Sequence, residues 1–174
     1  MKLRNATVDD AEDLVALANK SYRGESGKRG WTTESDYLDG TRTDTADVKG
    51  IINRENSVIL VLCSDQGSIV GSVNVRKQGD SCYLGMLMVD PDSQGGGIGN
   101  QLMQAAERHA REAWASRNMT MTVLSVRSEL IQYYERRGYR LTGETKPFVP
   151  GKGVFGIPRV KDLQFAVLEK DLAV

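Results

Sequence analysis

Apolar residues recur along the chain with two different spacings, and the spacing changes several times between that of helices and that of strands. A short strand is predicted at 3–6, and Thr7 with Asp10 three residues later is a typical capping pattern for a helix start. The helix that follows places apolar residues on one face at Ala11, Leu14, Val15, Ala18 and Tyr22. The periodicity is then lost from 23 to 47, before Val48, Ile51 and Ile52 mark a second short helix.

Three strand-like runs follow, at 57–63, 68–76 and 81–89. The turns between them, at 65–67 and 78–80, contain glycine and are short, so the three runs are expected to form antiparallel hairpins. The third run leads into a glycine-rich loop. A four-turn apolar stripe after the loop predicts a core-facing helix through Leu102, Met103, Ala106, Ala110, Ala113 and Trp114.

The rest of the chain adds a strand at 119–126, a helix at 128–137, and strands at 139–143 and 163–168. Strand, helix and strand between 81 and 126 form a crossover, which implies parallel pairing of its two strands. The predicted order is β-α-α-β-β-β-α-β-α-β-β. This order indicates an α/β fold with a central mixed sheet flanked by helices, in a single domain over 1–174.

The glycine-rich loop is the strongest candidate for a binding site. Glycines at 95, 96, 97 and 99 lead directly into a helix start, where unpaired N–H groups and the helix dipole favour an anion such as phosphate. A P-loop is excluded because Asn100 and Gln101 follow Gly99 in place of lysine and Ser or Thr. A dinucleotide fingerprint is excluded because its third glycine is replaced by Asn100 and no acid lies within 118–128. A tight corner without a ligand remains the alternative.

Gln94, Gly97 and Gly99 form the pattern Gln-x-x-Gly-x-Gly after a strand that ends at 87–91. This pattern resembles motif A of the GCN5-related N-acetyltransferase (GNAT) superfamily, and the predicted element order is similar to the superfamily's fold. The resemblance implies acetyl-CoA as co-substrate, with its pantetheine arm on the strand backbone at Leu87, Met88 and Val89. An amide near Met88 would polarise the carbonyl. The residues implied to hold the pyrophosphate are Gln94, Gly95, Gly96, Gly97, Ile98, Gly99 and Asn100.

Tyr134 carries a second resemblance, because superfamily members often place a tyrosine four residues before a Gly-aromatic pair, here Gly138-Tyr139. The resemblance implies that this tyrosine returns a proton to the CoA thiolate. Helix phase, at about 100° per residue, independently points Tyr134 inward and Tyr133 away from the sheet. A core tyrosine with a backbone partner is the alternative. Arg136 is implied to meet the 3′-phosphate or adenine end of CoA, although a solvated helix end is as compatible with the sequence.

The expected reaction is direct transfer of the acetyl group to an amine of a small molecule or protein in a ternary complex. The region 23–47 is expected to shape the acceptor site, with Glu25, Trp31 and Glu34 as candidate contacts; a solvated loop is the alternative. The resemblance implies a glutamate early in the strand before the glycine loop, but 81–85 contains no carboxylate. The base would therefore be water or one of Glu25, Glu34 and Asp36. This gap also permits a non-catalytic acyl-CoA-binding sensor. His109 is too far from the loop and is interpreted as structural.

Composition limits the remaining classes of partner. The 23 basic and 23 acidic residues balance, so neither nucleic acid nor a membrane is expected as a partner. Cys63 and Cys82 are interpreted as reduced core residues, and the start of the chain shows no signal segment, which together predict a cytoplasmic protein. No metal is expected, because the sequence contains no cluster with ligand spacing. The basic, proline-containing stretch 145–162 would border the acceptor pocket or serve a contact in a homodimer.

Overall fold

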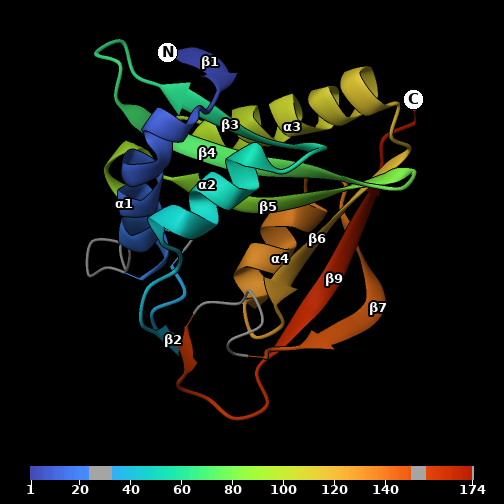
Figure 1. The fold of residues 1–174 in the computed structure, drawn as a ribbon. Coiled ribbons are helices and arrows are strands. Elements are labelled where there is room, and N and C mark those ends of the chain that lie inside the picture. Colours follow the sequence, from blue (N-terminus) through green and yellow to red (C-terminus); the bar gives the residue numbers. More distant parts are fainter. Residues whose placement is uncertain (24–32, 150–155, 174) are drawn as a thin grey trace.

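A computed structural model describes residues 1–23, 33–149 and 156–173 (Figure 1). Its main feature is a seven-stranded sheet with the order β1-β3-β4-β5-β6-β9-β7. The β5–β6 pair is parallel and the other neighbouring pairs are antiparallel, which confirms the predicted mixed sheet and the crossover. A separate two-stranded ribbon pairs β2 with β8.

The first half of the chain builds one side of the sheet and the helices on its front face in Figure 1. Thr7 donates its backbone N–H to the Asp10 carboxylate at 2.8 Å, so the predicted capping interaction forms, ahead of a 3-10 turn at Val8–Asp10. The elements are β1 (Lys2–Asn5), α1 (Ala11–Tyr22), β2 (Leu38–Asp39), α2 (Thr45–Asn53), β3 (Ser57–Cys63), β4 (Ile69–Gln78) and β5 (Ser81–Val89).

The second half begins with the longest helix and ends at the far edge of the sheet. Its elements are α3 (Ile98–Trp114), β6 (Asn118–Leu124), α4 (Ser128–Glu135), β7 (Arg140–Pro147), β8 (Ile157–Pro158) and β9 (Gln164–Asp171). Apolar residues of α1 and α2 pack against one face of the sheet, whereas α3 and the inner face of α4 pack against the other. No helix in the described ranges is long and apolar enough to cross a membrane.

The sheet splits in the middle, between its two parallel strands. β5 and β6 are paired only from Ser81 with Asn118 to Tyr83 with Thr120. Beyond that point β5 contains a bulge, because Met86 has a positive φ of 48° and the β4–β5 register shifts between Ser72 and Asn74. A bulge adds one residue to a strand and bends it, so the two strands diverge from here.

The bulge also reverses the alternation of side chains along β5. Leu84 faces α3, and so does Leu87, an odd number of residues later, whereas Met86 and Met88 face α1. A regular strand would place Leu84 and Met86 on the same face. The bulge therefore determines which face of the sheet each later side chain of β5 packs on.

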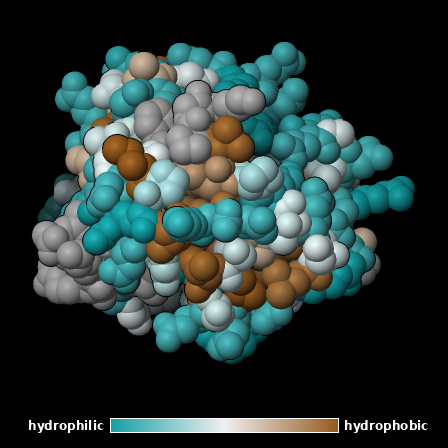
Figure 2. Space-filling model, turned by 90° about the horizontal axis from the view of Figure 1, so that it is seen from below, coloured by the Kyte–Doolittle hydropathy of each residue, from teal (hydrophilic) through white to brown (hydrophobic). Residues whose placement is uncertain are grey.

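Two differences from the predicted elements concern β7 and the β2–β8 ribbon. The strand expected at 139–143 extends to Pro147, because the register shift around Gly143, at φ 86°, lets β7 bend and continue instead of stopping. The β2–β8 ribbon was not predicted, since each partner is only two residues long. Seen from below, apolar residues lie among hydrophilic ones on the surface (Figure 2). Ile157 of β8 and Val160 are among the exposed large apolar residues of the described chain.

Candidate active site

A cavity of about 230 Å³ lies where β5 and β6 diverge. Its walls are the backbone and side chains of β5 from Tyr83 to Leu87 and of β6 from Met121 to Leu124. On the α1 face it is lined by Tyr22, Arg23, Glu34 and Arg42, and α4 contributes Leu130 and Tyr134. The cavity in the split sheet therefore contacts elements on both faces of the sheet.

Tyr134 lies in the wall of this cavity. Its side chain is 5% exposed, which confirms that it faces inward, while Tyr133 is half-buried. The ring packs edge-on against Tyr133 and Tyr139, with centroids 5.4 and 6.1 Å away. Within the described part of the chain no hydrogen bond to the Tyr134 hydroxyl is found, so the predicted alternative of a backbone partner is not supported there. Burial raises the pKa of Tyr134 well above its ordinary value, which makes it a neutral proton donor.

The backbone of β5 offers donors to the gap left by β6. Asp90 donates its N–H to Val70 on β4 at 2.8 Å, and Met88 is opposite Ser72 in the same ladder. Because backbone direction alternates along a strand, Met88 also points to β4, while Leu87 and Val89 point into the gap. Of the three predicted pantetheine contacts, Leu87 and Val89 therefore direct their N–H groups to the gap, and Met88 directs its N–H group to β4.

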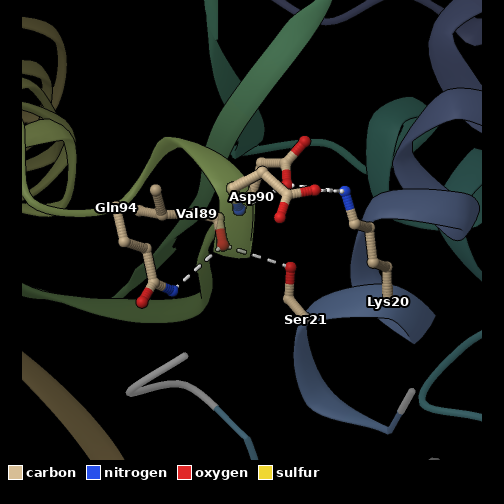
Figure 3. A network of polar contacts seen from close by, with 6 residues as sticks. Lys20, Ser21, Val89, Asp90 and Gln94 are labelled. Carbon is tan, nitrogen blue, oxygen red and sulfur yellow. Dashed lines mark hydrogen bonds and ion pairs between the residues drawn. The ribbon is translucent and has the colours of Figure 1, made fainter. Parts of the chain in front are cut away.

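The backbone carbonyls of Leu87 and Val89 accept hydrogen bonds from side chains around β5. Tyr22 donates its hydroxyl to the Leu87 carbonyl at 2.6 Å. Ser21 Oγ and Gln94 Nε2 both donate to the Val89 carbonyl at 3.3 Å (Figure 3). The bonds from Tyr22 and Ser21 hold the end of β5 against α1.

The glycine loop is exposed and tied to α1 at its base. Lys20 Nζ contacts Asp90 at 2.7 Å and Asp92 at 2.9 Å (Figure 3). Gly95 and Gly97 have positive φ angles of 95° and 74°, which favour glycine, and Gly97 caps the start of α3. Asn100 is half-buried, Ile98 and Gly99 are buried beneath the loop, and the first turn of α3 carries no acidic residue. The local geometry is that of an anion-binding helix start.

Charged residues gather at the α1 face of the cavity. Glu34, one of the three predicted acceptor contacts, lines the cavity. It forms an ion pair with Arg23 at 2.6 Å. The Arg42 guanidinium lies 5.0 Å from the centre of the Tyr22 ring. Glu25 and Trp31, the other two predicted contacts, lie outside the described residues.

Two of these cavity residues were not singled out as site residues in the sequence. Tyr22 is one of the residues that form the apolar face of α1, and this pattern predicts only that it lies in the core. Arg42 belongs to a polar stretch without periodicity, so no local pattern distinguishes it from its neighbours. Only the chain's path between α1 and α2 places it at the cavity.

A second cavity of about 540 Å³ lies along the outer side of α4. Arg136 is exposed and lines it together with Tyr133, Asp36 and Tyr37. Arg127 lines both cavities. Asp36 is therefore separated from Glu34, with which it was grouped as a candidate base.

The model of the acetyltransferase (GNAT) domain family matches residues 39–151. The matched range contains β5, the glycine loop and Tyr134. The chain belongs to this family.

Similarity to individual GNAT proteins is low but extends over much of the chain. It is 27% identical over 89 residues to blasticidin-S acetyltransferase of Streptomyces morookaense, covering 51% of this chain and 64% of that protein. It is 25% identical over 159 residues to mycothiol acetyltransferase of Propionibacterium freudenreichii, covering 87% of this chain and 47% of that protein. The chain thus spans less than two thirds of the length of either relative.

A solved GNAT structure shows the same fold. The PaiA N-acetyltransferase of Thermoplasma acidophilum, in complex with coenzyme A, superposes with a TM-score of 0.64 at 14% identity. The match covers 98% of both chains.

Other potentially reactive residues of this GNAT domain lie outside the cavity. His109 packs edge-on against Trp114 at 4.7 Å, and burial lowers its pKa, as expected for a structural residue. Cys63 and Cys82 are buried and free. Across the described ranges no group of three His, Cys, Asp or Glu residues is arranged to hold a metal ion.

Proposed function

We propose that the protein is an N-acetyltransferase that moves the acetyl group of acetyl-CoA directly to an amine in a ternary complex. The cavity in the split sheet carries this proposal, because Tyr134, whose raised pKa keeps it neutral, lines it together with the end of β5, the strand that leads into the glycine loop. Membership of the GNAT family supports it. We further propose a single domain over 1–174 that works in the cytoplasm, on small-molecule or protein amines, without nucleic acid or membrane partners.

The chain offers a fitting place for acetyl-CoA, which supplies the activated acetyl thioester. The N–H groups from Gln94 through Asn100 would hold the pyrophosphate. A Cβ placed on Gly95, Gly96 or Gly97 meets nothing within 4 Å, so this part of the loop surface is open. The N–H groups of Leu87 and Val89 would bind the pantetheine arm and polarise the thioester carbonyl. Arg136 would meet the 3′-phosphate or adenine end.

Tyr134 would act as the general acid. A thiolate is released when an amine takes the acetyl group, and a phenol with a raised pKa stays protonated until that charge develops. The nucleophile must be a neutral amine, and its proton would pass to water or to Glu34. No enzyme-bound acyl group is needed, since the amine attacks directly.

A non-catalytic acyl-CoA sensor is the alternative. Of the described residues that line the cavity, Glu34 alone is a carboxylate, and its oxygen is engaged by Arg23. A protein with this arrangement could keep the donor site and lack a base. This reading predicts acetyl-CoA binding without turnover.

The two functions are separated by measuring binding and turnover on the same preparation. The full chain is incubated with acetyl-CoA and a panel of primary amines while free thiol is followed, and acetyl-CoA binding is measured by calorimetry. A transferase releases thiol in an amine-dependent manner above a no-amine control. Saturable binding with no amine-dependent release across the panel would favour the sensor, and absence of binding would contradict both.

A further inference from the structure

The α1 face of the cavity is rich in arginine. Arg23 and Arg42 line it, with Glu34 as the carboxylate among the described lining residues, and Arg127 at the start of α4 lines another part of the same cavity. Glu34 is engaged by Arg23 at 2.6 Å. The end of the cavity next to α1 therefore carries a positive charge. The glycine loop and α3, into which the loop leads, lie on the opposite face of the sheet.

Arg42 differs in its contacts from Arg23, the other arginine on this face. Its guanidinium is half-buried over the Tyr22 ring, and within the described ranges it forms neither a hydrogen bond nor an ion pair. Two other arginines near α1 form ion pairs: Arg4 with Asp10 at 2.8 Å and Arg23 with Glu34. A guanidinium that is partly removed from water and has no anion beside it is able to bind an oxyanion of a ligand.

The backbone holds Arg42 in place without help from its side chain. Its N–H donates to Asn19 Oδ1 at 2.6 Å, and Asn19 Nδ2 donates to the Thr43 carbonyl at 3.4 Å. Thr43 in turn donates its hydroxyl to Asp47 at 2.7 Å, at the start of α2. The position is thus set before a ligand arrives, as recognition sites require.

Tyr22 connects this arginine to the reacting strand. One side of its ring faces Arg42, and its hydroxyl donates to the Leu87 carbonyl. The Arg42 guanidinium is therefore one aromatic ring away from the strand whose N–H groups face the gap. Apolar Leu38, Phe148 and Phe165 line the same cavity and would accommodate an apolar side chain.

We infer that the acceptor is a primary amine that also carries a carboxylate, such as a free amino acid, and that Arg42 binds this carboxylate. Arginine matches a carboxylate with two parallel hydrogen bonds, which would orient the amine toward the split between β5 and β6. The inference rests on the proposed transferase function. It deepens that function by naming the class of acceptor.

The first test compares acceptors that differ only in charge. Methionine, leucine and phenylalanine are each assayed beside their primary amides, which match them in size and lack the carboxylate, together with simple alkylamines. We expect kcat/KM to be at least about tenfold higher for the acids. Thiol release that is equal for acids and amides, or confined to amines without a carboxylate, overturns the inference and leaves the transferase standing. Binding without release for every amine contradicts the proposed function itself.

The second test assigns the preference to Arg42. Arg42→Gln should collapse the acid-to-amide ratio by roughly 10- to 100-fold, the range expected for a lost charge-assisted bond, and Arg42→Lys should retain part of it. Arg54→Gln is the matched control, because Arg54 is exposed at the end of α2 and lines neither cavity. A melting temperature near that of the native chain shows that each variant folds. An unchanged ratio, or a comparable rise in the KM of acetyl-CoA alone, would exclude Arg42 as the carboxylate site.

Discussion

Tyr134 differs from the other buried tyrosines in what its hydroxyl contacts. Tyr22 donates to the Leu87 carbonyl and Tyr139 donates to Glu107 at 3.1 Å, so both hydroxyls stabilise the fold. The Tyr134 hydroxyl makes no such bond within the described part of the chain, and its residue lines the cavity. The Tyr134 hydroxyl is therefore the one of these three hydroxyls that is not used to hold the described fold together.

Replacing Tyr134 by phenylalanine should therefore slow turnover by about 10²- to 10⁴-fold, the usual contribution of a general acid. The affinity for acetyl-CoA and the melting temperature should change little, because no bond of the hydroxyl to the described residues is lost. Tyr133→Phe is the matched control, since Tyr133 is the half-buried neighbour on the same helix. Steady-state kinetics of both variants tests whether Tyr134 is the general acid. Equal turnover in Tyr134→Phe and the native chain would exclude Tyr134 from the mechanism.

The raised pKa of Tyr134 also predicts a pH profile. An acid must be protonated to act, and raising its pKa moves the loss of that proton to higher pH. Turnover should therefore show no fall caused by Tyr134 up to about pH 10, the ordinary pKa of tyrosine. A rate profile in saturating substrates checks this, and a descending limb near pH 8 that disappears in Tyr134→Phe would contradict it.

Local patterns predicted most elements, and the exceptions have a common cause. The strands at 57–63 and 81–89 have the predicted bounds, because glycine-containing turns mark the ends of each apolar run. The β2–β8 ribbon joins residues more than a hundred positions apart, and two residues a side leave no periodicity to detect. The bulge at Met86 was equally hidden, since its positive φ falls on a residue type that rarely adopts it. Features set by distant contacts thus require the structure.

The loop between β5 and α3 can be tested as an element by adding one charge. Gly96 has open space around it and, unlike Gly95 and Gly97, no positive φ, so Gly96→Glu should fold normally. The new carboxylate would repel the pyrophosphate, and acetyl-CoA affinity should fall by at least about 100-fold. Gly50→Glu provides the control, because Gly50 is exposed on α2 with similar free space. Calorimetry that shows native affinity in Gly96→Glu would rule out the loop as the anion site.

At the scale of the whole molecule, the split that makes the cavity also weakens the sheet. Three residue pairs between β5 and β6 join its two halves directly. Helix α3 packs on β3, β4 and β5 and reaches the second half through Glu107, whose carboxylate contacts Lys170 of β9 at 2.9 Å and accepts the Tyr139 hydroxyl. This network was not predicted, because nothing in the apolar stripe of α3 distinguishes a buried glutamate from an exposed one.

Glu107→Gln should therefore destabilise the chain by about 1–3 kcal/mol, less than a fully buried pair because Lys170 remains partly exposed. Urea unfolding measures the change, and Glu112→Gln, an exposed position on the same helix, should stay within about 0.5 kcal/mol of the native chain. The double variant Glu107→Met with Lys170→Met should recover part of the loss, because removing both charges leaves neither one unpaired. The single variants Glu107→Met and Lys170→Met are measured beside it. If the double variant lost as much stability as these two together, Glu107 and Lys170 would not couple the two halves of the sheet. The three β5–β6 pairs and the packing of α3 would then hold the halves together alone.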